Sequence, residues 1–144
     1  MITKNAQNYR DQVISLLKAE NLPTQDLPET LQNFIVALQD EEVISVAGLE
    51  VYGDYGLLRS LAVGKQFRNK GIAKNLLQQI ENLAKKQHIS ELYLLTETAL
   101  DYFKRNGYQK INRDEVPVSV QQSAEFSEVC PQSAIVMKKT IKHL

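Results

Sequence analysis

The chain has 144 residues, enough for one domain with a real hydrophobic core, and we expect residues 1–144 to form a single domain. Its 17 basic and 17 acidic residues cancel, so bulk charge favours neither nucleic acid nor a membrane surface as a partner. One cysteine excludes an internal disulfide, no cluster of metal ligands accompanies it, and the lack of a long apolar run or signal peptide predicts a cytoplasmic protein.

The first third of the chain is expected to hold a helix, a loop and a β-hairpin. Apolar residues at helical spacing, beginning with Tyr9 and Val13, predict a helix over residues 5–20. Two prolines predict a loop over residues 22–30, with room for a short second helix. Strands are then predicted over residues 34–38 and 43–51, joined by an acidic turn.

The middle of the chain predicts a buried strand followed by an amphipathic helix. Residues 57–63 are apolar except for Arg59 and Ser60, which indicates a strand. From Ile72 onward, apolar residues recur at helical spacing with polar residues on the other face. Strand alternation would point Arg59 and Ser60 to opposite faces.

The junction between this strand and helix is suited to a polyanion. A helix start leaves backbone N–H groups without partners and carries partial positive charge. Arg68 and Lys70 add full charges, while Gly71 and Ala73 keep the backbone accessible. The sequence therefore predicts a pocket for a pyrophosphate or a similar group.

The second half of the chain alternates strands and helices. A strand over residues 91–96 would complete a parallel crossover, and Thr98 is expected to cap a helix over residues 99–106. A strand at 108–111, a long connection with a short helix starting near Pro117, and a closing strand at 134–141 complete the chain. The predicted fold class is α/β (α+β), a mixed sheet in which antiparallel strands join a parallel crossover.

Several of these residues match a known family. The pattern Arg68-x-x-Gly71-x-Ala73, after a strand that ends in Leu61-Ala62-Val63, resembles the acetyl-CoA-binding motif of the GCN5-related N-acetyltransferases (GNAT). The run A-L-D-Y-F-K-R-N-G-Y at residues 99–108 resembles the family's second conserved region, so the resemblance covers roughly residues 30–112. The tail from Glu115 onward resembles a narrower branch, the arsenic-resistance-associated N-acetyltransferases.

This resemblance implies acetyl-CoA as co-substrate and a small-molecule amine, such as an amino acid or an amino-acid-like arsenical, as acceptor. The amine would attack directly in a ternary complex. The implied cofactor contacts are the pantetheine arm along the strand, with Phe103 packed beside it, and the pyrophosphate on the turn. The residues are Leu61, Ala62 and Val63 for the arm, and Arg68, Asn69, Lys70, Gly71, Ile72 and Ala73 for the turn. The alternatives are a non-catalytic acyl-CoA-binding module or sensor, and a structural domain that binds no CoA.

Two departures from the family pattern bear on catalysis. Many relatives carry a Tyr four residues before the Gly that ends the downstream helix, but here Phe103 stands there and Tyr102 is its neighbour. One step along a helix turns a side chain by about 100°, so Tyr102 is either a general acid or a packing residue. The histone-acetylating branch has a Glu where Leu57 stands. Candidate bases are ordered water and three carboxylates, Glu50, Glu97 and Glu125, of which we select Glu50.

Three further residues are candidates for substrate binding. Arg59 and Ser60 lie beside the cofactor motif, and Arg59 in a buried strand should meet either a substrate carboxylate or an internal acid. Cys130, held extended before Pro131, is either a small buried residue or a contact for the substrate or an arsenical. The sequence leaves open whether the chain is a monomer or a homodimer.

Overall fold

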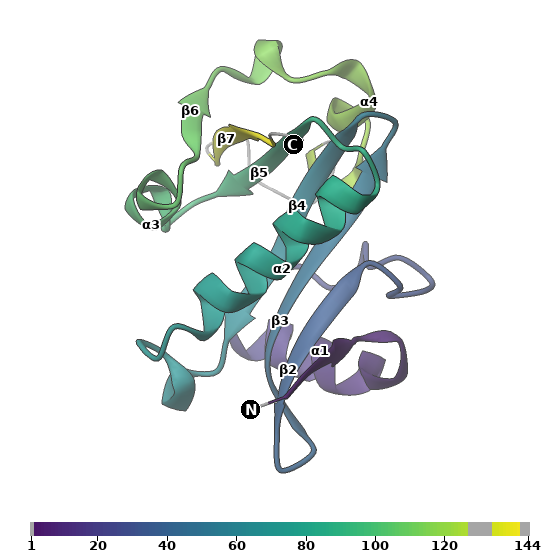
Figure 1. Ribbon diagram of the computed structural model, residues 1–144, viewed down its shortest axis with the longest axis vertical. Helices are drawn as coiled ribbons and strands as arrows, with labels where there is room; N and C mark the ends of the chain where they lie inside the picture. The colour runs from purple at the N-terminus through teal and green to yellow at the C-terminus, as the bar shows by residue number, and fades with distance from the viewer. Residues whose placement is uncertain (1, 127–133, 142–144) are drawn as a thin grey trace. The chain divides into compact units, whose positions relative to one another are not determined.

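In a computed structural model, which describes residues 2–126 and 134–141, seven strands form one mixed sheet in the order β1-β2-β3-β4-β5-β7-β6 (Figure 1). The pairs β1–β2, β2–β3, β5–β7 and β6–β7 are antiparallel, whereas β4–β5 is parallel. This confirms the predicted fold class. The strands are β1 (Ile2–Asn5), β2 (Phe34–Gln39), β3 (Glu42–Tyr52), β4 (Tyr55–Val63), β5 (Glu91–Thr96), β6 (Gln109–Ile111) and β7 (Ile135–Thr140). The helices are α1 (Arg10–Ala19), α2 (Ile72–Lys86), α3 (Leu100–Arg105) and α4 (Val118–Gln121).

The chain forms two compact units. The first unit comprises Met1–Leu49 and Leu58–Leu83, and the second comprises Glu50–Leu57 and Ala84–Leu144. The strand β4 contributes its first residues to the second unit and the rest to the first.

In the first unit, α1 and α2 lie on opposite faces of the strands (Figure 1). On one face, Val13 and Leu17 of α1 pack in a single hydrophobic cluster with Val36 and Leu38 of β2. On the other face, the side-chain amide of Gln79 in α2 donates to the Thr3 hydroxyl of β1, at 3.2 Å. Thr3 pairs with Ala37, which lies between Val36 and Leu38 and therefore points to the opposite face. The helices α1 and α2 thus lie on either side of the sheet.

The N-terminus differs from the sequence prediction. Instead of one helix over residues 5–20, the chain forms the edge strand β1, a 3-10 turn (Gln7–Tyr9) and then α1. The strand β1 is mostly exposed and pairs with β2 from Ile2↔Leu38 to Asn5↔Ile35. Its residues carry no apolar alternation, because what holds it is the pairing to β2 rather than a buried face.

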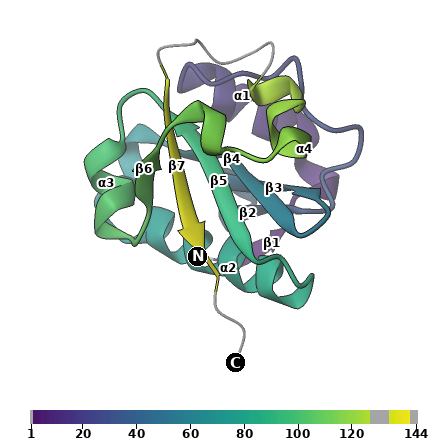
Figure 2. The same cartoon turned by 90° about the horizontal axis from the view of Figure 1, so that it is seen from above.

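In the second unit, β7 lies between β5 and β6 (Figure 2). The parallel pairing of β4 with β5 runs from Tyr55↔Glu91 to Leu57↔Tyr93. A second hydrophobic cluster gathers residues of β4, β5, β7 and the segment around α4. Its buried members are Leu57, Tyr93, Val116, Val120, Phe126 and Val136. The short helix starting near Pro117 and the closing strand are therefore confirmed.

The prediction that Thr98 caps α3 is wrong. α3 begins after Ala99, and it is the hydroxyl of Thr96, not that of Thr98, that accepts a hydrogen bond from the Ala99 N–H, at 3.0 Å. Thr96 lies at the end of β5 and is 9% exposed, so the strand delivers its hydroxyl to the helix start. The helix ends before Gly107, whose φ of +93° suits glycine, as predicted. No helix in the described part of the chain combines the length and apolarity that crossing a membrane requires.

Candidate functional site

The turn between β4 and α2 is open at the position predicted for a pyrophosphate. Gly71 has a φ of +78°, and a Cβ built on it would meet no atom within 4 Å. Asn69 is also left-handed, with a φ of +64°, and Lys70 is exposed beside it. Buried Ile72 anchors the first turn of α2, whose N–H groups have no partners within the helix. The turn therefore presents backbone donors and a cation to free space.

The side chain of Arg68 in this turn is already engaged. Its guanidinium forms an ion pair with Glu20, at the end of α1, and its Nε donates to the carbonyl oxygen of Val63 at 3.3 Å. The Arg68 side chain is still 49% exposed, against 11% for that of Glu20. The arginine thus remains accessible to an anion that would have to compete with Glu20.

The end of β4 is held in place by hydrogen bonds to β3. Ala62 belongs to the first unit's core cluster, and its carbonyl oxygen accepts a hydrogen bond of 2.7 Å from the buried hydroxyl of Ser45. Leu61 and Val63, on either side, are only half-buried. The backbone N–H of Gly64 donates to the carbonyl of Ile44 at 2.8 Å. This holds the strand to β3 until the turn begins.

Arg59 meets an internal acid, one of its two expected partners. Its Nη1 lies 2.7 Å from Asp26 Oδ2, and its Nη2 lies 2.8 Å from Asp26 Oδ1, with side chains only 1% and 4% exposed. The predicted opposite facing of Arg59 and Ser60 is wrong, since Arg59 Nε donates to Ser60 Oγ at 3.0 Å. The reason is the φ of +59° at Ser60, which breaks the strand's alternation.

Glu50, the carboxylate selected as the general base, has a partner on its own strand. Glu50, half-buried in β3, accepts a hydrogen bond of 2.5 Å from the Tyr52 hydroxyl two residues along. Because residues two apart on a strand share a face, this pair is a direct result of strand geometry. Tyr52 was missed in the sequence, although its spacing from Glu50 could have revealed it.

Tyr102 and Phe103 of α3 form an aromatic group with Tyr108. The rings of Tyr102 and Phe103 meet edge-on at 5.4 Å, and those of Phe103 and Tyr108 at 5.6 Å. The Tyr102 hydroxyl is buried without a hydrogen-bond partner in the described residues. Burial raises the pKa of Tyr102 above its usual value, with a smaller opposing effect from Arg105.

The remaining candidates are scattered. Glu97 is exposed, Glu125 is 7% exposed, and Cys130 lies outside the described residues. Asp26 was not singled out in the sequence, because an Asp in a proline-containing loop gives no sign of a partner 33 positions away.

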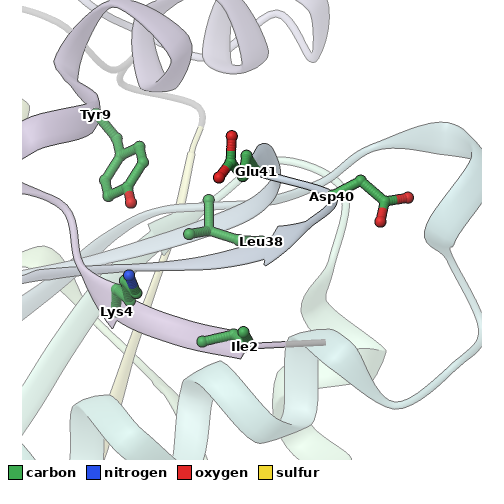
Figure 3. A pocket seen from close by; sticks show the side chains of 6 residues that line it. All are labelled: Ile2, Lys4, Tyr9, Leu38, Asp40 and Glu41. Carbon is green, nitrogen blue, oxygen red and sulfur yellow. The ribbon is translucent and has the colours of Figure 1, made fainter.

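The first unit also has a cavity of about 460 Å³ at its outer edge. Figure 3 shows side chains of β1, of the 3-10 turn before α1, of β2 and of the β2–β3 turn around it. Its lining residues are Ile2, Lys4, Tyr9, Leu38, Asp40 and Glu41. None of the residues predicted for the site lines it, and its charges are mixed.

Comparison with known proteins places this geometry in a family. Residues 30–110, more than half of the chain, match the acetyltransferase (GNAT) domain. The chain belongs to the GNAT acetyltransferase family. An uncharacterised N-acetyltransferase of Chlorobaculum tepidum is 28% identical over 145 residues, covering 97% of this chain and 88% of that protein.

Two other similar proteins carry more specific names. An amino-acid acetyltransferase of Pseudomonas syringae is 30% identical over 93 residues, 63% of this chain. This chain spans only 22% of that relative's length. The structure of N-acetylglutamate synthase from Neisseria gonorrhoeae, complexed with coenzyme A and N-acetyl-glutamate, shares the fold with a TM-score of 0.81 at 18% identity, covering 99% of this chain and 35% of that one.

As a GNAT enzyme, the chain is an acyltransferase that uses acetyl-CoA as co-substrate. Its own residues fit a diphosphate: the space at Gly71 is open, and Lys70 and the exposed part of Arg68 supply positive charge. A large side chain at position 71 would fill this open space and block the backbone to the predicted anion.

Proposed function

We propose that this GNAT enzyme acetylates the amino group of a small molecule, and that the acceptor is an amino acid or an amino-acid-like compound. The match to an amino-acid acetyltransferase over 93 residues is the observation that carries this proposal. The shared fold of N-acetylglutamate synthase supports the same class of acceptor. The tail's resemblance to the arsenic-resistance-associated branch adds an amino-acid-like arsenical to the acceptors worth testing.

In this proposal the first unit holds the co-substrate. The pyrophosphate is bound by the turn from Arg68 to Ala73, through its backbone N–H groups and the charges of Arg68 and Lys70. The pantetheine arm follows the half-buried residues Leu61 and Val63. Support comes from the open space at Gly71 and from the fixed end of β4.

We assign the proton transfers to Glu50 and Tyr102. The acceptor nitrogen attacks the thioester carbonyl, a C–N bond forms and the C–S bond breaks. Glu50, directly or through water, takes the proton that the nitrogen loses. Tyr102 donates a proton to the departing thiolate, while Phe103 packs beside the pantetheine. What supports this assignment is that the Tyr102 hydroxyl has no hydrogen-bond partner among the described residues.

Acceptor recognition is less constrained. Arg59 is bound to Asp26, so the carboxylate of an amino-acid acceptor is recognised by another group. Substrate contacts by Ser60 and Cys130 stay predictions.

A panel of amines tests the proposal. Purified protein and acetyl-CoA are mixed with single amino acids, with simple monoamines and with an arsenical analogue of an amino acid, while free thiol is followed. We expect thiol release with members of the amino-acid group and none with the same compounds already acetylated on nitrogen. Binding of acetyl-CoA without thiol release for any amine would favour a non-catalytic acyl-CoA-binding module instead.

A matched pair of glycine variants tests the phosphate turn. Gly53 and Gly71 both have positive φ, of +65° and +78°, and a Cβ on either would meet no atom within 4 Å. Gly71→Glu should abolish acetyl-CoA binding in a calorimetric titration, because the new carboxylate meets the pyrophosphate. Gly53→Glu carries the same backbone strain and charge in the β3–β4 turn and should bind normally. Equal loss in both variants would reject the assignment.

A further inference from the structure

A continuous chain of polar contacts links the loop before β2 to the middle of β4. Arg59 uses Nη1 and Nη2 to grip the Asp26 carboxylate, and Nη1 also lies 3.3 Å from the Asp26 carbonyl oxygen. Its remaining nitrogen, Nε, donates to the hydroxyl of Ser60. Every nitrogen of this buried guanidinium therefore has a partner, and the last of them is the next residue of its own strand.

Ser60 has a backbone conformation that needs support. Its φ of +59° is left-handed, a region that costs energy for any residue with a Cβ and is unusual within a strand. Such strain persists only where the surroundings enforce it, and it is concentrated at functional sites. The strained residue directly precedes Leu61–Val63, the segment along which we place the pantetheine arm.

The ion pair is poorly explained as a source of stability alone. Removing two charges from water costs about as much as their attraction returns, so apolar residues of similar volume often replace such a pair without loss. The loop also has a second anchor that does not touch β4. The guanidinium of Arg10 donates to the carbonyl oxygens of Pro28, at 2.5 Å, and Glu29, at 3.2 Å. Unlike Arg10, Arg59 also contacts Ser60.

We propose that Asp26 and Arg59 are positioning residues: together they hold Ser60 left-handed and so set the direction in which β4 enters Leu61–Val63. Asp26 orients the guanidinium, and the guanidinium fixes Ser60 through its hydroxyl. Neither residue contacts the acceptor. The catalytic consequence rests on the proposed function, since a misdirected strand would misplace the thioester. The structural consequence, the conformation of Ser60, does not.

The test replaces the pair rather than breaking it. The variant Asp26→Leu with Arg59→Met leaves no unpaired buried charge, so we expect its urea midpoint to stay at or above that of the wild type. Its kcat should fall by about 10- to 100-fold, the effect of a misplaced reacting group, with the KM for the amine unchanged. In a crystal structure of this variant, the φ of Ser60 should leave the left-handed region.

A glycine background makes the test specific. Glycine adopts positive φ without strain, so after Ser60→Gly the strand no longer needs the ion pair. The paired replacement should then lower kcat by less than about threefold. Comparing the two backgrounds cancels any direct effect of losing the Ser60 hydroxyl. An equal loss in both backgrounds, or full kcat in the first, would overturn the proposal.

Two further variants keep the outcome interpretable. Should the paired variant not fold, Arg59→Lys keeps the positive charge but loses the planar two-pronged contact with the carboxylate. Its loss of kcat should likewise be larger with Ser60 than with Ser60→Gly. Arg10→Met loosens the loop without touching Ser60, so its effect should be the same in both backgrounds. A wild-type chain that turns over no amine would refute the proposed function, while the crystallographic φ of Ser60 would still decide this inference.

Discussion

Arg68, in the turn between β4 and α2, is ion-paired with Glu20, the residue that follows the last turn of α1. A carboxylate at the C-terminal end of a helix is unfavourable for the helix, so Glu20 is better explained by its partner than by α1. A pyrophosphate that binds Arg68 must compete with Glu20. If this turn binds the pyrophosphate as proposed, the ion pair weakens the binding of acetyl-CoA.

Glu20→Gln should accordingly bind acetyl-CoA more tightly, by about two- to fivefold, since an exposed ion pair is worth at most about 1 kcal/mol. Calorimetric titration measures the change, and the gain should shrink at high salt. Asp11→Asn, an exposed carboxylate at the start of the same helix, serves as the control and should leave affinity unchanged. Weaker binding after Glu20→Gln would mean that Glu20 holds Arg68 in its productive position instead.

Tyr102→Phe should separate activity from stability. If the Tyr102 hydroxyl donates to the leaving thiolate, its removal lowers kcat by about 10²-fold with little change in KM. Because this buried hydroxyl has no partner in the described residues, its loss should leave the free energy of unfolding equal or about 1 kcal/mol higher. Steady-state kinetics measures the change in kcat and KM, and urea unfolding measures the change in stability. Unchanged kcat would assign Tyr102 to packing.

Gly48 of β3 lies beneath the ring of Phe34, its partner in β2. A Cβ at Gly48 would lie only 2.5 Å from Cζ of that ring and closer still to Cε2, nearer than van der Waals contact allows. Gly48→Ala should therefore lower the free energy of unfolding by about 1–3 kcal/mol through overpacking. The control is Gly64→Ala, where φ is −55° and the nearest atom, Phe67 Cδ2, is 3.4 Å away. Its change should stay within about 0.5 kcal/mol, and equal losses in the two variants would contradict the overpacking.

The burial of Tyr93 should make the free energy of unfolding fall at alkaline pH. Burial, with smaller contributions from Glu91 and Tyr55, raises the pKa of Tyr93 from 10.0 to about 12. The unfolded chain thus releases this proton first, so the stabilisation is complete below pH 10 and is lost as pH rises towards 12. The loss amounts to about 2–3 kcal/mol, and Tyr93→Phe should remove it. An unchanged slope in that variant, measured by urea unfolding, would contradict this origin.

Much of the fold was predictable because its signals are local. The strand Glu91–Thr96 appears with the predicted bounds, and the helix that starts at Ile72 follows its apolar spacing. The edge strand Ile2–Asn5 escaped prediction, since four mostly exposed residues become a strand only by pairing with β2. The cap at Thr96 was missed for a similar reason: which of two nearby hydroxyls reaches a helix start depends on where the preceding strand ends.

The sequence by itself predicted an accessible basic turn before α2, because a missing side chain, neighbouring cations and a helix start are all properties of consecutive residues around Gly71. It also limited the partner of Arg59 to a substrate carboxylate or an internal acid, because a buried guanidinium requires an anion. Only the tertiary structure decided that the anion is Asp26, and that Ser60 is turned to the same arginine. Those two facts depend on a contact between residues 33 positions apart and on a backbone angle of +59°, neither of which leaves a pattern in the sequence.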